Sequence, residues 1–209
     1  YDASQGCITI DGVDVKDMSL EQLRGSISLV MQDVFLFSDT IEGNIAYARP
    51  DCSFEEVKRA AVMADANHFI QSLPEGYDTI VGERGVGLSG GQKQRISLAR
   101  ALLKDPAILI LDDTTSAVDM ETEKQIQHSL NELDFPCTKI IIAHRISTTK
   151  YAAKILVLQD GRITESGSHE ELIAKKGYYY QVVQLQTGQQ ISEQSRDVSG
   201  AYAECGKEV

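Results

Sequence analysis

Apolar runs alternate with amphipathic segments along the second half of the chain. Residues 108–111 and 140–143 are uninterrupted apolar stretches, and residues 90–103 and 121–133 before them carry apolar side chains at helical spacing. Strands that are apolar throughout and are joined by helices are typical of a parallel sheet with both faces covered. The pattern therefore predicts an α/β fold in which helices flank a parallel sheet.

Shorter patterns occupy the first part of the chain. Residues 7–10 read as a strand that ends at the turn Asp11-Gly12, and residues 27–31 read as another, after a short helix that Ser19 and Gln22 can cap reciprocally. We therefore expect an antiparallel, hairpin-bearing portion at the start of the chain.

Two more capping pairs mark the beginnings of helices. Ser53 with Glu56 predicts one helical stretch that runs to about residue 70, and Ser168 with Glu171 predicts a terminal helix. Before that last helix, two short strands flank the turn Asp160-Gly161.

The chain contains no internal repeat, and from residue 187 onward it is polar and aperiodic. Such a segment cannot bury enough apolar surface to order itself. We predict a single domain over residues 1–186 and a disordered tail over residues 187–209.

Composition narrows the classes of function. The 209 residues include 31 acidic and 20 basic side chains, a formal net charge of −11. This charge repels a phosphate backbone, so we expect no nucleic-acid partner. The four cysteines form no C-x-x-C pair, which disfavours a zinc site or disulfide framework and favours a reducing compartment. No apolar run approaches the ~20 residues that span a bilayer.

Polar residues follow the predicted strands where a parallel sheet binds its ligands. Asp112 and Asp113 follow one apolar run, His144 follows the next, and Gln32 follows the earlier strand. Two carboxylates, an imidazole and an amide at one edge suit a hydrated Mg²⁺ and a nucleotide phosphate. The alternative is that each carboxylate only forms a turn and that the histidine is structural.

A glycine-rich segment precedes the helix predicted over residues 90–103. In Leu88-Ser89-Gly90-Gly91-Gln92, Ser89 can cap the helix and the two glycines let an anion approach the free amides of the first turn. The alternative is an ordinary flexible glycine turn. Residues 85–90 also match G-x-G-x-x-G, but the charged, glycine-bearing residues 81–84 before them disfavour a nicotinamide cofactor, which needs a buried strand there.

Taken together, these motifs resemble the nucleotide-binding domain of an ATP-binding cassette (ABC) transporter over most of the chain. Residues 88–92 are similar to the family's signature sequence, 108–112 to its Walker B strand, 116–119 to its D-loop and 82–85 to the X-loop of exporters. Gln32 matches the Q-loop glutamine and His144 the switch histidine. The resemblance implies a P-loop NTPase-like sheet with a helical signature subdomain.

The resemblance also implies roles for these residues. Asp112 would hold Mg²⁺ through water, Gln32 would sense the metal and the γ-phosphate of ATP, and His144 would hydrogen-bond that phosphate. Two cassettes, identical or paralogous, would close head to tail, so that the signature of one caps the ATP of the other. The residues at that shared interface would be Ser89, Gly90, Gly91, Gln92 and Asp119.

Transmembrane domains fused upstream would complete such an exporter and place this domain at the cytoplasmic face of the membrane. The family's phosphate loop, G-x-x-x-x-G-K-[ST], is missing, because the single Gly-Lys pair, Gly206-Lys207, precedes Glu208. We therefore expect a fragment that begins after that loop and is inactive alone.

A second departure concerns Asp113, which stands where the family has a catalytic glutamate. The shorter side chain retracts the carboxylate by roughly 1 Å, and a misplacement of that size can cost on the order of 100-fold in rate. We expect slow hydrolysis at this site and a heterodimeric exporter with two unequal sites. A non-hydrolysing, ATP-dependent regulatory clamp is the alternative, while soluble cassettes that act on DNA or ribosomes are disfavoured by the acidic charge.

Overall fold

The computed structural model describes residues 3–82, 87–113 and 119–188, and the chain divides into two compact units, Tyr1–Ala143 and His144–Val209. The elements of the first unit are β1 (Thr9–Ile10), β2 (Val13–Asp14), α1 (Leu20–Ser26), β3 (Ile27–Val30), β4 (Asp39–Thr40), α2 (Ile41–Ala46), α3 (Phe54–Met63), α4 (Asn67–Ser72), the 3-10 helix η1 (Gly76–Asp78), β5 (Ile80–Val81), α5 (Gly90–Leu102), β6 (Ile108–Asp112), α6 (Met120–Asn131) and β7 (Thr138–Ile142). Those of the second are α7 (Ile146–Thr149), β8 (Ile155–Gln159), β9 (Arg162–Gly167), α8 (His169–Lys175) and α9 (Tyr178–Thr187).

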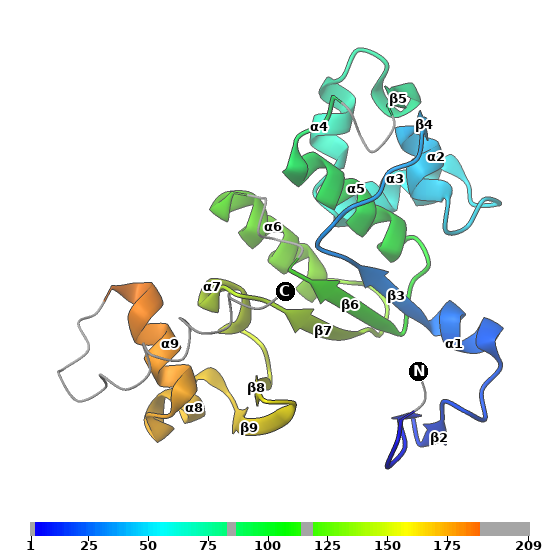
Figure 1. Cartoon of the computed structure of the whole chain (residues 1–209). Helices are drawn as coiled ribbons and strands as arrows, with labels where there is room; N and C mark the ends of the chain where they lie inside the picture. The colour runs from blue at the N-terminus through cyan, green and yellow to red at the C-terminus, as the bar shows by residue number, and fades with distance from the viewer. Residues whose placement is uncertain (1–2, 83–86, 114–118, 189–209) are drawn as a thin grey trace, which may run out of the picture. The chain divides into compact units, whose positions relative to one another are not determined.

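The predicted parallel sheet is confirmed in the first unit. Its strands lie in the order β3-β6-β7, and both pairs are parallel (Figure 1). The antiparallel portion at the start is smaller than expected. It consists of β1 and β2, joined at Asp11-Gly12, where both residues have positive φ as a tight hairpin turn requires. The expectation that β3 belongs to it was wrong, since β3 pairs with β6, about eighty residues away along the chain.

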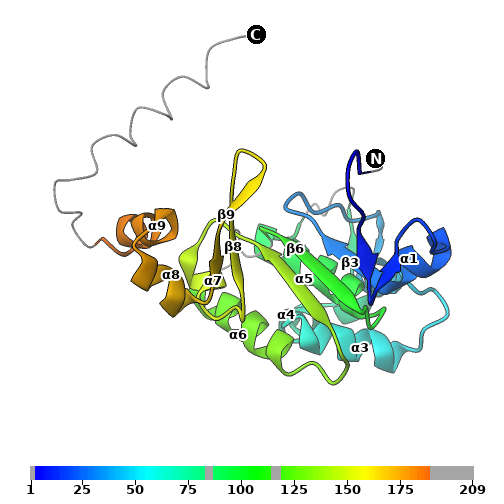
Figure 2. The same ribbon diagram turned by 90° about the horizontal axis from the view of Figure 1, so that it is seen from below.

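One face of the sheet carries the core. Val30 and Leu109 are 0% exposed, and they share a hydrophobic cluster with Ile96 of α5 and Ile126 of α6. Figure 2 shows α3 and α6 on one side of these strands. Burying alternate residues of each strand against helices is the main favourable term in such a fold.

The other face of the sheet is open in the described part of the first unit. Leu29, Ile140 and Ile142 are apolar but 54%, 47% and 49% exposed. The prediction that both faces are covered was therefore wrong for the described residues. An apolar run indicates only that both sides of a strand can be buried. It does not show which element covers each side.

Left-handed residues divide two of the predicted helices. The stretch expected to run from Ser53 to about residue 70 is interrupted at Asp65, whose φ is 53°, and becomes α3 and α4. The terminal helix is likewise interrupted at Lys176, with φ 53°, and becomes α8 and α9. The capping boxes at Ser19, Ser53 and Ser168 are all confirmed. Local capping signals thus predicted where helices begin better than where they end.

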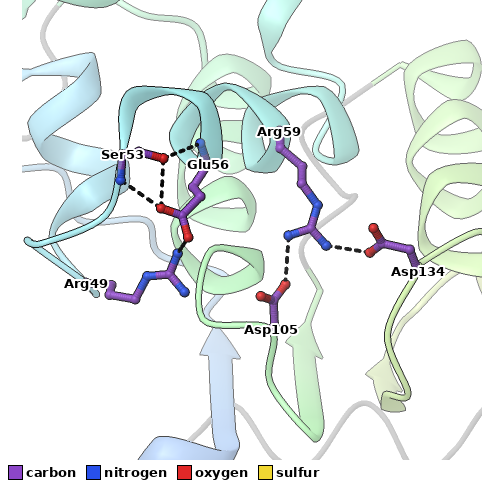
Figure 3. A network of polar contacts seen from close by, with 6 residues as sticks. All are labelled: Arg49, Ser53, Glu56, Arg59, Asp105 and Asp134. Carbon is purple, nitrogen blue, oxygen red and sulfur yellow. Dashed lines mark hydrogen bonds and ion pairs between the residues drawn. The ribbon is translucent and has the colours of Figure 1, made fainter.

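An ion-pair network ties α3 to the two loops that follow α5 and α6 (Figure 3). Arg59 of α3 donates to Asp105 at 3.3 Å and also to Asp134. The hydrogen bond that Arg59 donates to the Asp134 carboxylate raises the pKa of Arg59 above its ordinary value. Next to it, Arg49 pairs with Glu56, whose carboxylate also caps α3 at Ser53. The hydrogen bond from the Ser53 backbone lowers the pKa of Glu56.

No helix in the described ranges combines the length and apolar character that a membrane span needs.

Candidate functional site

The carboxyl ends of β3 and β6 bring three of the predicted site residues to one edge of the sheet. Val30 lies opposite Leu111 in this parallel pair, so Gln32 and Asp112 emerge from neighbouring strands. Asp112 is the last residue of β6, opposite Ile142 of β7, rather than the first residue after the strand. Gln32 is exposed and Asp112 is partly buried. The Asp112 carboxylate and the Gln32 amide therefore lie at an edge of the sheet that solvent or a bound molecule can reach.

Asp113 occupies a constrained position immediately after β6. Its φ is 44°, the residue is only 8% exposed, and its backbone nitrogen donates to the Ile142 carbonyl at 2.9 Å. Aspartate tolerates the left-handed region better than most side chains because its short polar group can hydrogen-bond locally. The residue is therefore suited both to making this turn and to presenting a carboxylate near Asp112.

The carboxylates at this edge could take part in a Mg²⁺ site only together with a nucleotide. Among the described residues, no three His, Cys, Asp or Glu side chains gather closely enough to hold a metal ion. Mg²⁺ in nucleotide sites needs only one or two protein carboxylates, since phosphates and waters complete its shell. Asp112 could supply one such carboxylate, and Gln32 follows the neighbouring strand.

The start of α5 has the geometry of an anion site. Ser89 is the N-cap: its Oγ accepts from the Gln92 nitrogen at 3.3 Å, and Gln92 Oε1 accepts from the Ser89 nitrogen at 2.9 Å. In the described part of the chain, no acceptor takes the amides of Gly90 and Gly91. These two free donors at the positive end of a helix dipole can receive a phosphate. Gln92 itself closes the cap, a use of its side chain that sequence reasoning did not anticipate.

Arg95, one turn into α5, fixes this helix end and was missed at the sequence level. Its Nη1 donates to the carbonyl of Asp65 at 2.8 Å and to the Asp65 carboxylate at 3.2 Å, and its Nε reaches the Gly91 carbonyl at 3.4 Å. Its guanidinium also lies 4.7 Å from the centre of the Phe69 ring. The left-handed corner between α3 and α4 thus presents the groups that anchor α5. No local pattern predicts this, because Asp65 lies 30 residues away along the chain.

The loop after Gln32 is held from within by Arg100 of α5. This side chain donates to the carbonyls of Phe35 (3.0 Å) and Asn44 (2.7 Å), and fully buried Asn44 bonds the backbone of Phe37 on both sides. Burial lowers the pKa of Arg100. Phe37 stacks on Tyr47 at 4.2 Å, while Phe35 and Tyr47 remain 50% and 60% exposed. A rigid loop with exposed aromatic rings therefore follows Gln32, a feature that the sequence analysis also missed.

Asp119 caps α6. Its carboxylate accepts from the nitrogens of Glu121 (3.1 Å) and Thr122 (3.0 Å) and from the Thr122 hydroxyl (2.9 Å). The backbone hydrogen bond from Thr122 is the main cause that lowers its pKa. A helix cap explains the residue locally, and a role at an interface between cassettes remains a prediction. The two other predicted motifs are described only in part. Residues 83–85 of the X-loop and residues 116–118 of the D-loop lie outside the described residues.

His144 is the first residue of the second unit. Its side chain is exposed, and its carbonyl accepts a hydrogen bond from the Gln186 side chain at 2.7 Å. Its backbone position is thus defined by the second unit while its imidazole is free to meet a ligand.

Comparison with known proteins decides the family. The profile of the ABC transporter family matches residues 1–116, more than half of the chain. The chain belongs to the ABC transporter family. As an ABC transporter sequence it is 55% identical over 194 residues to the ATP-dependent lipid A-core flippase of Legionella pneumophila (strain Paris), covering 93% of this chain and 33% of the flippase.

Two further ABC proteins extend this likeness. The ABC transporter ATP-binding protein YknU of Bacillus subtilis (strain 168) is 55% identical over 186 residues, 89% of this chain and 32% of YknU. The solved structure of a bacterial Atm1-family ABC exporter with ATP bound superposes with a TM-score of 0.87 at 44% identity, over 92% of this chain and 34% of that one. The predicted α/β fold of an ABC cassette is confirmed. The chain spans about a third of the length of these relatives.

Proposed function

We propose that this chain is the ATP-binding module of an ABC exporter, which binds and hydrolyses ATP to drive a substrate across a membrane. The observation that carries the proposal is the tip of α5, where the amides of Gly90 and Gly91 are free and the helix is capped by Ser89. In a member of the ABC transporter family, such a tip is placed to bind the phosphates of ATP. These relatives are an ATP-dependent flippase, an ABC transporter ATP-binding protein and an ABC exporter, which favours export over a non-hydrolysing clamp.

The site is completed by a second cassette. The sequence contains no G-x-x-x-x-G-K-[ST] loop, so these 209 residues offer α5 and the strand ends without a phosphate cradle and are inactive alone. In the assembly, Ser89, Gly90, Gly91 and Gln92 face the ATP held by the partner cassette, and Asp119 lies at the shared interface.

At the strand ends, the residues have separate tasks. Asp112 and Gln32 would hold Mg²⁺ through water, and the charge that this ion would supply is the kind that offsets the negative phosphates of ATP. Asp113 orients the attacking water, and His144 donates to the γ-phosphate. Because Asp113 is one methylene shorter than the family's glutamate, turnover at this site is slow, and the partner is a paralogous cassette whose own site is completed by α5 of this chain.

The remaining partners are transmembrane domains, which this module meets at the cytoplasmic face of the membrane. Two observations support this. The chain spans about a third of its relatives, and the exposed rings of Phe35 and Tyr47 stand on the rigid loop directly after Gln32. Exposed aromatic side chains are enriched where proteins meet a partner.

Gly91→Val in the full-length transporter tests the function. The branched side chain at the tip of α5 displaces a phosphate from the free amides, so ATP hydrolysis and substrate export in proteoliposomes should fall roughly 100-fold, as expected for a misplacement near 1 Å. ATP binding, measured by nucleotide cross-linking, should persist at the strand ends.

Gly25→Ala is the matched control. Gly25 lies in α1, and a Cβ added there meets no atom within 4 Å, so hydrolysis should be unchanged. Full ATP turnover in Gly91→Val would refute the assigned role of α5.

A further inference from the structure

The side-chain amide of Gln186 forms hydrogen bonds to the backbone on both sides of Arg145. Its Nε2 donates to the carbonyl of His144 at 2.7 Å, and its Oε1 accepts from the nitrogen of Ile146 at 2.9 Å. Arg145 is extended, with φ −103° and ψ 131°. In extended backbone, the carbonyl before a residue and the nitrogen after it point to the same side, so a primary amide can pair with both as a neighbouring strand would.

The helix that carries Gln186 is itself firmly held within the second unit. Tyr179 and Val183 of α9 are 4% and 8% exposed and pack with Ile155 and Leu172, the latter fully buried. The Glu165 carboxylate of β9 accepts from the nitrogens of Tyr178 and Tyr179 in the first turn of α9. Gln186 therefore reaches the backbone of His144 from an anchored element rather than from a loose end.

The two hydrogen bonds fix the backbone rather than the imidazole. The side chain of His144 is exposed, so its backbone sets the point from which the ring extends and the rotamers that are open to it. Residues that hold a functional side chain through its backbone or ring commonly change activity by ten-fold or more when lost. Exposed hydrogen bonds contribute little to overall stability, so their main effect is on geometry.

We infer that Gln186 is a positioning residue for His144: by bonding the His144 carbonyl and the Ile146 nitrogen, it holds in place the backbone from which the imidazole reaches the γ-phosphate of ATP. This inference rests on the function proposed above for His144. It adds a residue 42 positions away along the chain, in the last turn of α9, to the machinery of ATP hydrolysis.

The first test is Gln186→Ala in the full-length transporter. With both hydrogen bonds lost, kcat for ATP hydrolysis should fall roughly 10-fold while KM for ATP changes less than about two-fold, because binding is left to other groups. Gln186→Glu keeps the acceptor for the Ile146 nitrogen but has no donor for the His144 carbonyl. Its kcat should therefore lie between that of the wild type and that of Gln186→Ala. Leu185→Ala, an adjacent residue that is 68% exposed, is the matched control and should behave as wild type.

The second test separates positioning from general stabilisation. In a His144→Ala background, Gln186→Ala should cause no further loss of kcat, since the group that it positions is gone. Hydrogen exchange of the peptide that contains Ile146 should speed up in Gln186→Ala in either background, while that of β8 stays unchanged.

Two results would overturn the inference: an unchanged kcat in Gln186→Ala, or an equal loss in the presence and absence of the His144 imidazole. If His144→Ala hydrolyses ATP at the wild-type rate, the function proposed for His144 fails instead. If His144→Ala is inactive and Gln186→Ala is fully active, only the positioning role of Gln186 fails.

Discussion

Among the described residues other than glycine, aspartate accounts for most of those in the left-handed conformation. Positive φ values occur at Asp11, Asp65, Asp105, Asp113 and Asp160, with Lys176 as the one other non-glycine among the described residues. Asp113 therefore has a local conformational reason to be aspartate in addition to its position beside Asp112. Its short carboxylate is a compromise between a backbone turn and the reach that hydrolysis requires.

Asp113→Glu should separate these two demands. Extending the carboxylate by roughly 1 Å should raise ATP hydrolysis at this site, by as much as ~100-fold, because alignment of the attacking water improves. The left-handed backbone should at the same time cost about 1 kcal/mol of stability. Phosphate release from the full-length transporter and thermal unfolding measure the two effects.

Asp113→Asn is the control, since it retains the tolerance for positive φ and removes the charge. Its hydrolysis rate should not rise. An unchanged rate in Asp113→Glu, with equal turnover at both composite sites, would contradict the assignment of a slow site.

At the scale of elements, α5 shows how two kinds of contact define one functional helix end. The capping box of Ser89 and Gln92 is local, whereas the tether of Arg95 to Asp65 and Phe69 reaches the α3–α4 corner. The local cap determines where the helix begins, and the tether determines where that beginning lies in the fold. Both are needed if Gly90 and Gly91 are to face a phosphate in a constant direction.

Arg95→Lys should loosen the start of α5 while keeping the charge. Lysine cannot reproduce the forked hydrogen bonds or the contact with the Phe69 ring, so the free energy of unfolding should fall by about 1 kcal/mol, and by about 2 kcal/mol in Arg95→Ala. Hydrogen exchange should accelerate over the first turn of α5. Lys124→Ala, in an exposed pair with Glu121 at 4.0 Å, is the control. Equal protection of α5 in all variants would contradict the tether.

At the scale of the whole molecule, distant segments of the first unit are joined by polar links at the surface and by one buried face of the sheet. Arg59 joins α3 to the loops at Asp105 and Asp134 (Figure 3). The opposite face of the sheet exposes Leu29, Ile140 and Ile142, an apolar surface in a chain about a third as long as its relatives. Surface ion pairs contribute far less to the free energy of unfolding than buried apolar area does. Arg59 therefore affects how α3 lies against these two loops more than it stabilises the fold.

Arg59→Ala should therefore have a small, salt-dependent effect. With two exposed ion pairs lost, the free energy of unfolding should decrease by at most about 1 kcal/mol at low salt, and the difference should shrink at high salt. Lys58→Ala makes the same change of net charge one position earlier and serves as the control. Chemical denaturation at two salt concentrations measures both variants, and a loss that is independent of salt would contradict an electrostatic link.

The sequence by itself determined the features that depend on neighbouring residues. Serine caps, Asp-Gly turns and apolar runs predicted the starts of α1, α3, α5 and α8, two hairpins and the class of the fold, because each signal and its effect lie within a few residues. The same local patterns drew attention to Asp112, Asp113, Gln32 and the start of α5, whose motifs together resembled the family that the comparisons confirmed.

Tertiary structure alone decided what depends on contacts between distant residues. Three such contacts are the parallel pairing of β3 with β6, the hydrogen bonds of Arg95 to Asp65 and those of Gln186 to the His144 backbone. The breaks at Asp65 and Lys176 were likewise seen only in the structure. Such contacts form only once the chain has paid the entropy of closing long loops, and no local pattern encodes their partners.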